Sequence, residues 1–365
     1  MMFNSNRVRT TEKIENQFNI VRTILAIAIA LGIAFLLIMT VSETPLADFW
    51  TLLSGPLENR NSMITIISKA IPLLFTAIAI SLVYSAGQIN IGAEGAFFAG
   101  SVAATAVAIL PNIPTIIYIP LSLLAGAVVG AIVMGIPAVL YTRYNSVTIV
   151  TSLMMNYVAL YAGLYVILNP LRDQAAGFEG SYAFQATAKL PSVFTNRLHI
   201  GLFIAILVVM FAYFLLNKTT FGYRILAVGN NPKFANYSGI KVNKNIILVT
   251  LLAGLIAGLG GSVEVLGNYN RFMYTDFTNH GWDGMMISVL CRNNPKYIIV
   301  GALFIAYLQT SADTLNFTSS IPPEVINVVQ AIIIIFVAAN EFLKRWEHKK
   351  IVENSQKSLA IGEVN

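Results

Sequence analysis

The chain has 365 residues and a formal net charge of +6, and only 11% of its residues are Asp, Glu, Lys or Arg, whereas a soluble domain carries roughly 25%. Hydrophobic residues make up 56% of the chain, and its mean hydropathy is +0.70. This composition leaves too little polar surface to cover a soluble particle and excludes a disordered chain, so it predicts an integral membrane protein.

The rare cysteines and histidines give no sign of metal chemistry. The single cysteine, Cys291, provides no disulfide framework, and the three histidines are too far apart in the sequence for a zinc site. The basic surplus lies between apolar runs and in the tails, so we expect no nucleic-acid partner. We expect this chain to bind no metal or cofactor of its own.

Runs without charged residues divide the chain into membrane-spanning segments, because about 20 residues carry one helix across the hydrocarbon core. The first run is too long for a signal peptide and no small-residue cleavage site follows it, so we expect a retained helix. The run at 95–142 is long enough for two crossings, with a turn at Pro111 and Pro114. We predict ten spans, at about 20–41, 63–86, 91–110, 115–141, 146–168, 197–216, 245–267, 281–291, 296–312 and 325–343.

The basic residues orient these spans. With the N-terminus in the cytoplasm, ten crossings place 17 of the 23 Lys and Arg residues on the cytoplasmic side and 6 on the other. The predicted organisation is a cytoplasmic tail at 1–19, one transmembrane domain at 20–343 and a cytoplasmic tail at 344–365. Beyond the tails, we expect soluble parts only in an outer loop at 169–196 and a cytoplasmic loop at 217–244.

Polar residues interrupt the apolar sequence between the second and third spans. Asn90 and Glu94 lie in a stretch of small and polar residues at 88–95. A charge in hydrocarbon is costly, and non-helical backbone is tolerated there only where protein or water covers it. Two interpretations stay open: a broken segment lining a solute pathway, or a carboxylate that caps the first turn of the third span.

Two further polar positions lie within apolar runs. Asn156, in the middle of the fifth span, is suited either to a hydrogen bond between helices or to a hydrogen bond with a solute. Glu264 follows a glycine cluster at 258–261, which favours close approach of helices, and it is expected near the outer end of the seventh span.

The cytoplasmic loop at 217–244 has the composition of two short helices. The first is expected at about 223–228 and to end at Gly229. Asn230 or Asn231 caps the second, Pro232 occupies its first turn, and Gly239 ends it. Such a helix pair provides a docking surface, although its composition also suits a purely interfacial element.

Three segments carry a resemblance to a known family. The loop resembles the pattern Gly-x-x-x-x-Ala-Val-Gly-x-Asn-x-x-Ala-Ala-x-x-x-Gly-Ile, at Gly222, Ala227, Val228, Gly229, Asn231, Ala235, Gly239 and Ile240. Residues 90–95 are similar to Asn-Ile-Gly-x-Glu-Gly, and 281–295 to Gly-Phe-x-Gly-Ile-Ala-Val-Ala-Leu-Leu-Gly-Arg-x-x-Pro. These patterns are typical of permease subunits of ATP-binding-cassette (ABC) importers for branched-chain amino acids, simple sugars and nucleosides. The chain most resembles the nucleoside permeases.

This chain departs from the family pattern at several positions. Phe234 replaces the first alanine of the pair, Leu226 lies where an arginine is frequent, and Cys291 replaces a small residue. The resemblance nevertheless extends from about residue 60 to residue 345. It implies an all-α polytopic membrane protein of about ten transmembrane helices with a type II ABC importer-like permease fold.

The resemblance also implies a function and partners. The chain is expected to be the solute-translocating subunit, with ATP and Mg bound by a separate ABC ATPase, because it has no Gly-x-x-x-x-Gly-Lys-Ser/Thr phosphate loop. The expected system also contains a second permease, identical or homologous, and an extracellular solute-binding protein with or without a lipid anchor. It lies in a bacterial cell membrane, and both termini of this chain are expected to be cytoplasmic. The expected ATPase-coupling residues are Gly222, Arg224, Val228, Gly229, Asn231, Pro232, Ala235 and Gly239.

Other functions remain open on the sequence. A simple sugar such as ribose or galactose, or a branched-chain amino acid, suits the predicted pathway residues Asn90, Glu94 and Asn156 as a nucleoside does. A self-contained secondary carrier also places broken helices near the membrane midplane. An intramembrane enzyme is disfavoured because the sequence offers no catalytic pair or metal cluster.

Overall fold

A computed structural model describes residues 28–332, except residues 30, 112, 196–197, 320, 323–324, 326–327 and 330. The predicted tails at 1–19 and 344–365 therefore lie outside the described residues, as do most of the span predicted at 325–343 and the start of the span at 20–41.

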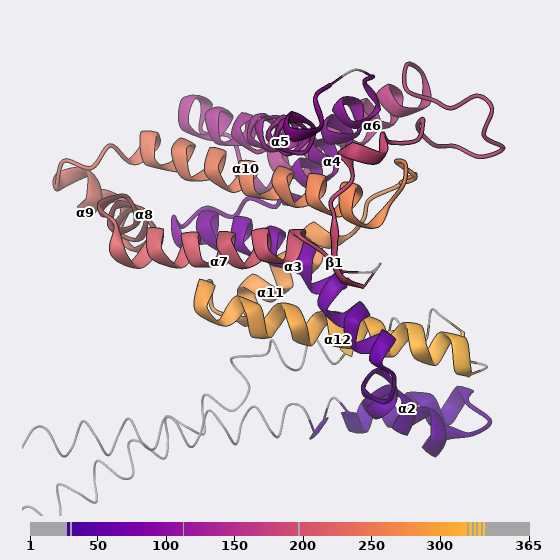
Figure 1. Cartoon of the computed structure of the whole chain (residues 1–365). Helices are drawn as coiled ribbons and strands as arrows, with labels where there is room; N and C mark the ends of the chain where they lie inside the picture. Colours follow the sequence, from indigo (N-terminus) through magenta and orange to yellow (C-terminus); the bar gives the residue numbers. More distant parts are fainter. Residues whose placement is uncertain are drawn as a thin grey trace, which may run out of the picture. The chain divides into compact units, whose positions relative to one another are not determined.

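The described chain is mainly helical (Figure 1). An apolar helix at Leu31–Val41 precedes α2. The longer elements that follow are α2 (Pro45–Glu58), α3 (Arg60–Ser85), α4 (Ala93–Ile109), α5 (Thr115–Tyr144), α6 (Thr148–Leu168), α7 (Gly201–Lys218), α10 (Val242–Asn268) and α12 (Pro295–Thr318). The shorter helices are η1 (Ala186–Ala188), α8 (Thr220–Asn230), α9 (Pro232–Tyr237) and α11 (His280–Leu290). Strands β1 (Ser192–Thr195) and β2 (Leu198–His199) pair antiparallel, with Ser192 opposite His199.

The helices group into two compact units. Residues 56–310 form the larger unit, and residues 1–55 together with 311–365 form the other. In the second unit, the rings of Phe35 and Phe49 meet edge to face at 5.1 Å between centroids. The functional features below all belong to the larger unit.

Six described helices, α3, α5, α6, α7, α10 and α12, are long and apolar enough to cross a membrane. The chain is thus a polytopic helical protein, but the prediction of ten spans is wrong for the described residues. The span predicted at 91–110 is α4, a 17-residue helix that is largely buried by its neighbours. The span predicted at 281–291 is α11, whose 11 residues cover only about 16 Å of a hydrocarbon core of about 30 Å.

Glycines set the core of the larger unit, where α4, α5 and α10 pack against one another (Figure 1). A Cβ on Gly258 of α10 would lie 2.2 Å from the carbonyl oxygen of Gly126, and a Cβ on Gly130 would lie 2.5 Å from that of Gly254. The hydrophobic effect does not drive association of helices within a lipid bilayer, so close van der Waals packing of their backbones has to stabilise it. This confirms the close helix approach predicted from the glycine cluster.

The chain between α10 and α12 is a discontinuous element. After α10 ends, residues 269–279 are non-helical, and α11 then begins beside the middle of α3, where the hydroxyl of Thr76 donates to the carbonyl of His280 at 2.8 Å. At its other end, the turn after α11 meets the last part of α3, where Ser81 donates to the carbonyl of Asn293 at 2.7 Å. Residues 269–290 are therefore half extended chain and half helix.

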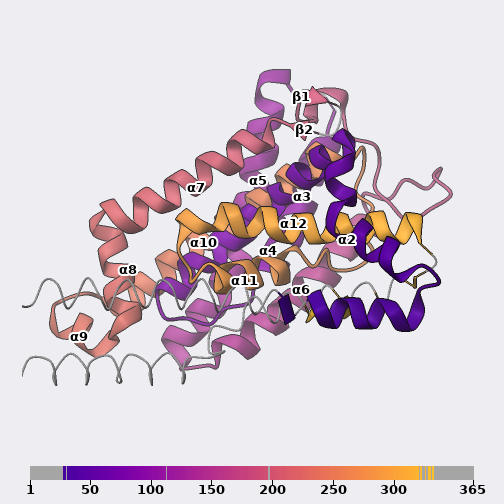
Figure 2. The same ribbon diagram turned by 90° about the horizontal axis from the view of Figure 1, so that it is seen from below.

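The loop at 169–196 and the α8–α9 pair lie at opposite ends of α10. The amide of Leu190 donates to the carbonyl of Leu266, near the end of α10, whereas α8 and α9 contact its beginning (Figure 2). The 27 residues of α10 separate these two regions by about 40 Å. Opposite ends agree with the prediction that these two loops lie on different sides of the membrane.

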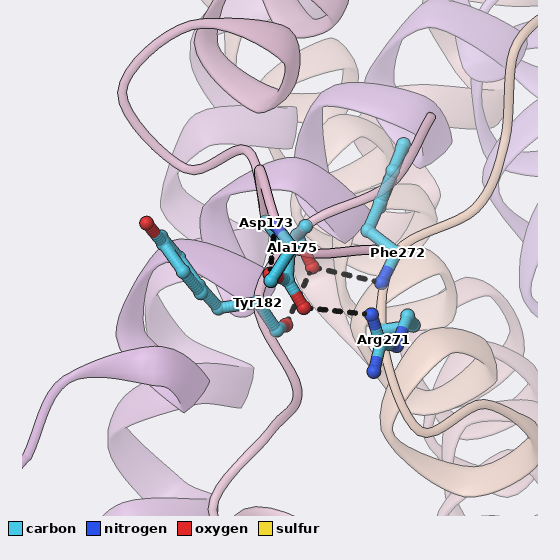
Figure 3. Close-up of polar contacts among 6 residues, drawn as sticks. Asp173, Ala175, Tyr182, Arg271 and Phe272 are labelled. Atoms are coloured by element: carbon cyan, nitrogen blue, oxygen red, sulfur yellow. Dashed lines mark hydrogen bonds and ion pairs between the residues drawn. The ribbon is translucent and has the colours of Figure 1, made fainter. Parts of the chain in front are cut away.

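An ion pair and hydrogen bonds hold the loop at 169–196 against the start of the non-helical segment at 269–279 (Figure 3). Arg271 pairs with Asp173 at 3.0 Å and its guanidinium lies 5.1 Å from the centre of the Phe178 ring. The Ser181 hydroxyl accepts from the amide of Phe272 at 3.0 Å. These bonds fix where residues 269–279 enter the helix bundle.

Replacing Gly258 with valine is expected to prevent formation of the α4–α5–α10 core. The added side chain has no space between touching backbones, and overpacking alone costs about 1–3 kcal/mol even in adaptable cores. We expect loss of monodisperse protein in size-exclusion chromatography of detergent extracts. Gly177→Val is the matched control, because nothing lies within 4 Å of a Cβ at Gly177, and equal recovery of both variants would contradict the proposed packing.

Candidate functional site

The non-helical connection between α3 and α4, residues 86–92, is held by polar side chains. The Oδ1 atom of Asn90 accepts from the amide of Gly92 at 2.8 Å, which closes a tight turn before α4. From α6, the hydroxyl of Ser152 accepts from the amide of Ile91 at 3.2 Å. The interruption predicted from the sequence is thus present, and protein side chains bond part of its backbone.

Asn156 of α6 joins this connection to the neighbouring helix. Its Oδ1 atom accepts from the amide of Gly95 at 2.9 Å, and its Nδ2 atom donates to the carbonyl of Ile91 at 3.0 Å. The side-chain amide therefore uses both of its functions on backbone groups of one segment. This supports the first of the two roles predicted for Asn156, a bond between helices.

Glu94 connects α4 to the discontinuous element between α10 and α11. Its carboxylate accepts from the Thr278 hydroxyl at 3.0 Å, from the amide of Asn279 at 2.9 Å, and from the amide of Gly281. Glu94 lies in the first turn of α4, yet its side chain caps α11, whose own N-cap residue makes no side-chain cap. A carboxylate at a helix N-terminus is favoured by the unpaired amides and the helix dipole.

The structure thus brings the three predicted pathway residues together. Asn90, Glu94 and Asn156 are each at most 1% exposed, and their side chains bond the protein itself. Among the described residues, the Nδ2 atom of Asn90 has no hydrogen-bond partner. A role for these residues in lining a solute pathway stays a prediction.

Glu264 resembles Glu94 in burial but has a simpler environment. It lies near the end of α10, as predicted, and is 6% exposed. The side-chain amide of Asn268 donates to it at 2.9 Å, one turn further along the same helix. This bond gives Glu264 a structural partner near the end where the 169–196 loop lies.

The two short helices predicted in the loop at 217–244 are present as α8 and α9. Asn231 caps α9 by accepting from the amide of Phe234 at 3.0 Å, and Pro232 follows in the first turn. Gly239 ends the pair with a φ of +82°. One detail of the prediction is wrong: α8 continues through Gly229 to Asn230, because Gly229 provides a close contact and not a helix end.

Gly229 lies directly against the connection between α3 and α4. A Cβ on Gly229 would lie 2.1 Å from the carbonyl oxygen of Ser85, and a Cβ on Gly87 would lie 3.1 Å from the Cα of Gly229. A cleft of about 340 Å³ adjoins this contact and is lined by residues that include Ser85, Asn230 and the turn at 292–295. Three segments that are far apart along the chain, the end of α3, α8 and the turn at 292–295, therefore meet at one place.

The remaining residues of the α8–α9 pair divide into a buried and an exposed set. Val228 and Ala235 are buried with Ile246 of α10, and Gly222 is also buried. Arg224 is exposed, together with three aromatic side chains, Tyr223, Phe234 and Tyr237. The buried residues of the pair therefore pack against α10, and its exposed surface is partly aromatic and partly basic.

The groups that Glu94 binds were not predicted from the sequence. Thr278 and Asn279 lie 184 and 185 residues away in sequence and no local pattern connects them. Tyr157, Tyr161 and Tyr165 were also not predicted as a group, although their spacing of four places them on one face of α6.

A bundle of helices that are long and apolar enough to cross a membrane is typical of a multi-pass membrane protein. The family model described as "Branched-chain amino acid transport system / permease component" matches residues 62–338. The chain belongs to this permease family. No solved structure matches the chain.

Several curated proteins are similar over most of this chain. The guanosine ABC transporter permease NupP of Bacillus subtilis is 32% identical, over 86% of this chain and 92% of its own length. The nucleoside ABC transporter permease NupB of Lactococcus lactis is 30% identical, over 94% and 99%. The glucose ABC transporter permease TsgB13 of Haloferax volcanii is 28% identical, over 88% of both chains.

Replacing Glu94 with glutamine is expected to lower the melting temperature of the purified protein in detergent, without any solute present. Glutamine keeps one acceptor oxygen but leaves a buried amide of the 279–281 turn unpaired, which costs about 1–3 kcal/mol. Glu179→Gln, at an exposed position, is the control. An unchanged melting temperature for Glu94→Gln would show that the carboxylate does not cap α11.

Proposed function

We propose that this chain is the permease subunit of an ATP-driven importer that takes up nucleosides. The observation that carries the proposal is the contact between α8 and the 86–92 connection, which joins the exposed α8–α9 surface to the polar interior. Membership of the permease family and the ABC transporter relatives support it. In this proposal the chain hydrolyses no ATP, and ATP and Mg bind to a separate ATPase.

The ATPase docks on α8 and α9 in this proposal. Tyr223, Phe234 and Tyr237 are 67%, 62% and 89% exposed, and aromatic residues are enriched among those that dominate binding energy at protein interfaces. Arg224 and Lys233 add positive charge to the same surface. The α8–α9 end of α10 is then cytoplasmic, and the 169–196 loop faces the solute-binding protein on the opposite side of the membrane.

In this proposal, a movement of α8 is transmitted to the polar interior of the helix bundle through backbone contact. Because Gly229 touches residues 85–87 without an intervening side chain, a displacement of α8 acts on the connection that leads to Glu94. Asn156 and Glu94 in turn bond this region to α6 and to α11. ATP-driven closure of the ATPases would shift these elements between two arrangements, as in alternating switches generally.

The chemistry around α11 favours an uncharged solute. In many transporters the N-terminus of a discontinuous helix binds the carboxylate of an anionic substrate. Here Glu94 already occupies the N-terminus of α11, so this position is not free to receive the carboxylate of an amino acid. A nucleoside or a simple sugar remains compatible, and two of the relatives named above are guanosine and nucleoside permeases.

The solute prediction is tested by uptake into proteoliposomes that contain the complete importer and its solute-binding protein. We expect ATP-dependent accumulation of labelled guanosine, because two of the relatives are guanosine and nucleoside permeases. We expect little accumulation of labelled galactose for the same reason, and little of labelled leucine because Glu94 occupies the N-terminus of α11. Galactose uptake without guanosine uptake would make the protein a sugar permease. Uptake by the purified chain alone, driven by an ion gradient, would favour a secondary carrier.

The docking surface is tested by the double variant Phe234→Ala/Tyr237→Ala. Removing two exposed aromatic anchors is expected to cost about 2 kcal/mol of docking free energy or more, and so to reduce co-purification of the ATPase and solute-stimulated ATP hydrolysis. Phe214→Ala, an aromatic residue of α7 that is 59% exposed, is the matched control. Unchanged hydrolysis in the double variant would move the ATPase contact elsewhere.

A further inference from the structure

The exposed face of α6 is unlike the faces of the other spanning helices. α6 is the least buried of the six candidate spans and yet is less apolar than α5 and α7, which are more buried. The exposed side chains of α6 include three tyrosines, Tyr157, Tyr161 and Tyr165, which are 49%, 66% and 68% exposed. Lipid-facing tyrosines concentrate at the membrane interfaces, so tyrosines along much of one face indicate a use beyond contact with lipid.

Aromatic side chains occupy the middle of this face. The rings of Tyr157 and Tyr161 are stacked, with 6.5 Å between centroids and 22° between planes. The ring of Phe277, from the non-helical segment before α11, meets Tyr157 edge to face at 5.3 Å. Tyr157 and Tyr161 are 49% and 66% exposed, so the stack has free ring surface.

The depth of this cluster points to an aqueous path. Tyr157 is the tenth of the 21 residues of α6, about 14 Å from its start, whereas lipid-facing tyrosines concentrate at the two membrane surfaces. The exposed carboxylate of Asp276 adjoins Phe277. Non-helical backbone and a charged side chain at such a depth are tolerated where they line protein or water, and not lipid.

The buried polar residues hold this aromatic cluster in place. Asn156, which precedes Tyr157, is bonded to Ile91 and Gly95. Glu94 bonds Thr278 and Asn279, the two residues that follow Phe277. Two of the residues predicted to line a pathway, Asn156 and Glu94, are thus buried behind the cluster and connect to Tyr157 and to the residues after Phe277.

We propose that Tyr157, Tyr161 and Phe277 form a stacking site for the base of a nucleoside on its way through the permease. Stacking on aromatic side chains accepts any base, because every base has a flat π face, so the site would pass purine and pyrimidine nucleosides alike. This inference rests on the nucleoside uptake proposed above.

The site is tested by photolabelling the complete importer with 8-azidoguanosine during ATP-driven uptake in proteoliposomes. In the wild type, we expect label on peptides that contain residues 157–161 or 277, and excess guanosine should remove it. For Tyr157→Ala/Tyr161→Ala we expect the label to disappear and guanosine uptake to fall about tenfold, given the strength of base–aromatic stacking. ATP hydrolysis and co-purification of the ATPase should be unchanged.

Two further variants separate stacking from folding. Tyr157→Phe keeps the ring and should retain label and uptake, and Tyr213→Ala removes a tyrosine of α7 that is 41% exposed and should behave as wild type. If Tyr157→Ala is poorly inserted, Tyr161→Ala alone serves, because its ring is the more exposed.

Three outcomes would overturn the stacking site, and they are distinguishable. Normal guanosine uptake and labelling in the double variant would remove the site and leave the proposed function intact. Loss of assembly with the second permease in Tyr161→Ala would make this face a subunit interface. If the wild-type importer takes up no nucleoside, the proposed solute and the stacking site are both wrong.

Discussion

Two stretches of non-helical backbone inside a bundle of apolar helices impose the main physical constraint on this permease, because unpaired backbone groups there cost several kcal/mol each. Residues 86–92 and 269–279 contain these groups. Asn156 satisfies part of the first stretch, and Glu94 satisfies the end of the second. These two side chains therefore bond α6 to the start of α4, and α4 to the start of α11.

The same bonds give the proposed transport cycle a physical route. α8 contacts residues 85–87 through Gly229, and these residues continue into the turn of Asn90 and the carboxylate of Glu94. What the arrangement provides is a set of rigid connections from an exposed surface to an aromatic cluster, in which no long flexible loop intervenes.

Local features of the fold were predictable because their physics is local. The caps of α9 depend on a few consecutive residues, and Asn231, Pro232 and Gly239 occupy the predicted positions. The count of spans was less predictable, because hydropathy does not distinguish a helix that faces lipid from one that is buried by its neighbours. For this reason α4 and α11 resembled spans in the sequence, although one is a core helix and the other a half-length helix.

The sequence by itself determined that the chain is a membrane protein, where its apolar runs lie, and which permease family it belongs to. Composition and short motifs can be recognised without knowing how the chain packs in space. Only the tertiary structure decided what Glu94 and Asn156 bind. Their partners depend on how α4, α6 and the chain before α11 pack, and that packing depends on backbone contacts at glycines such as Gly258. Sequence spacing contains no information about which amide a buried carboxylate meets 185 residues away.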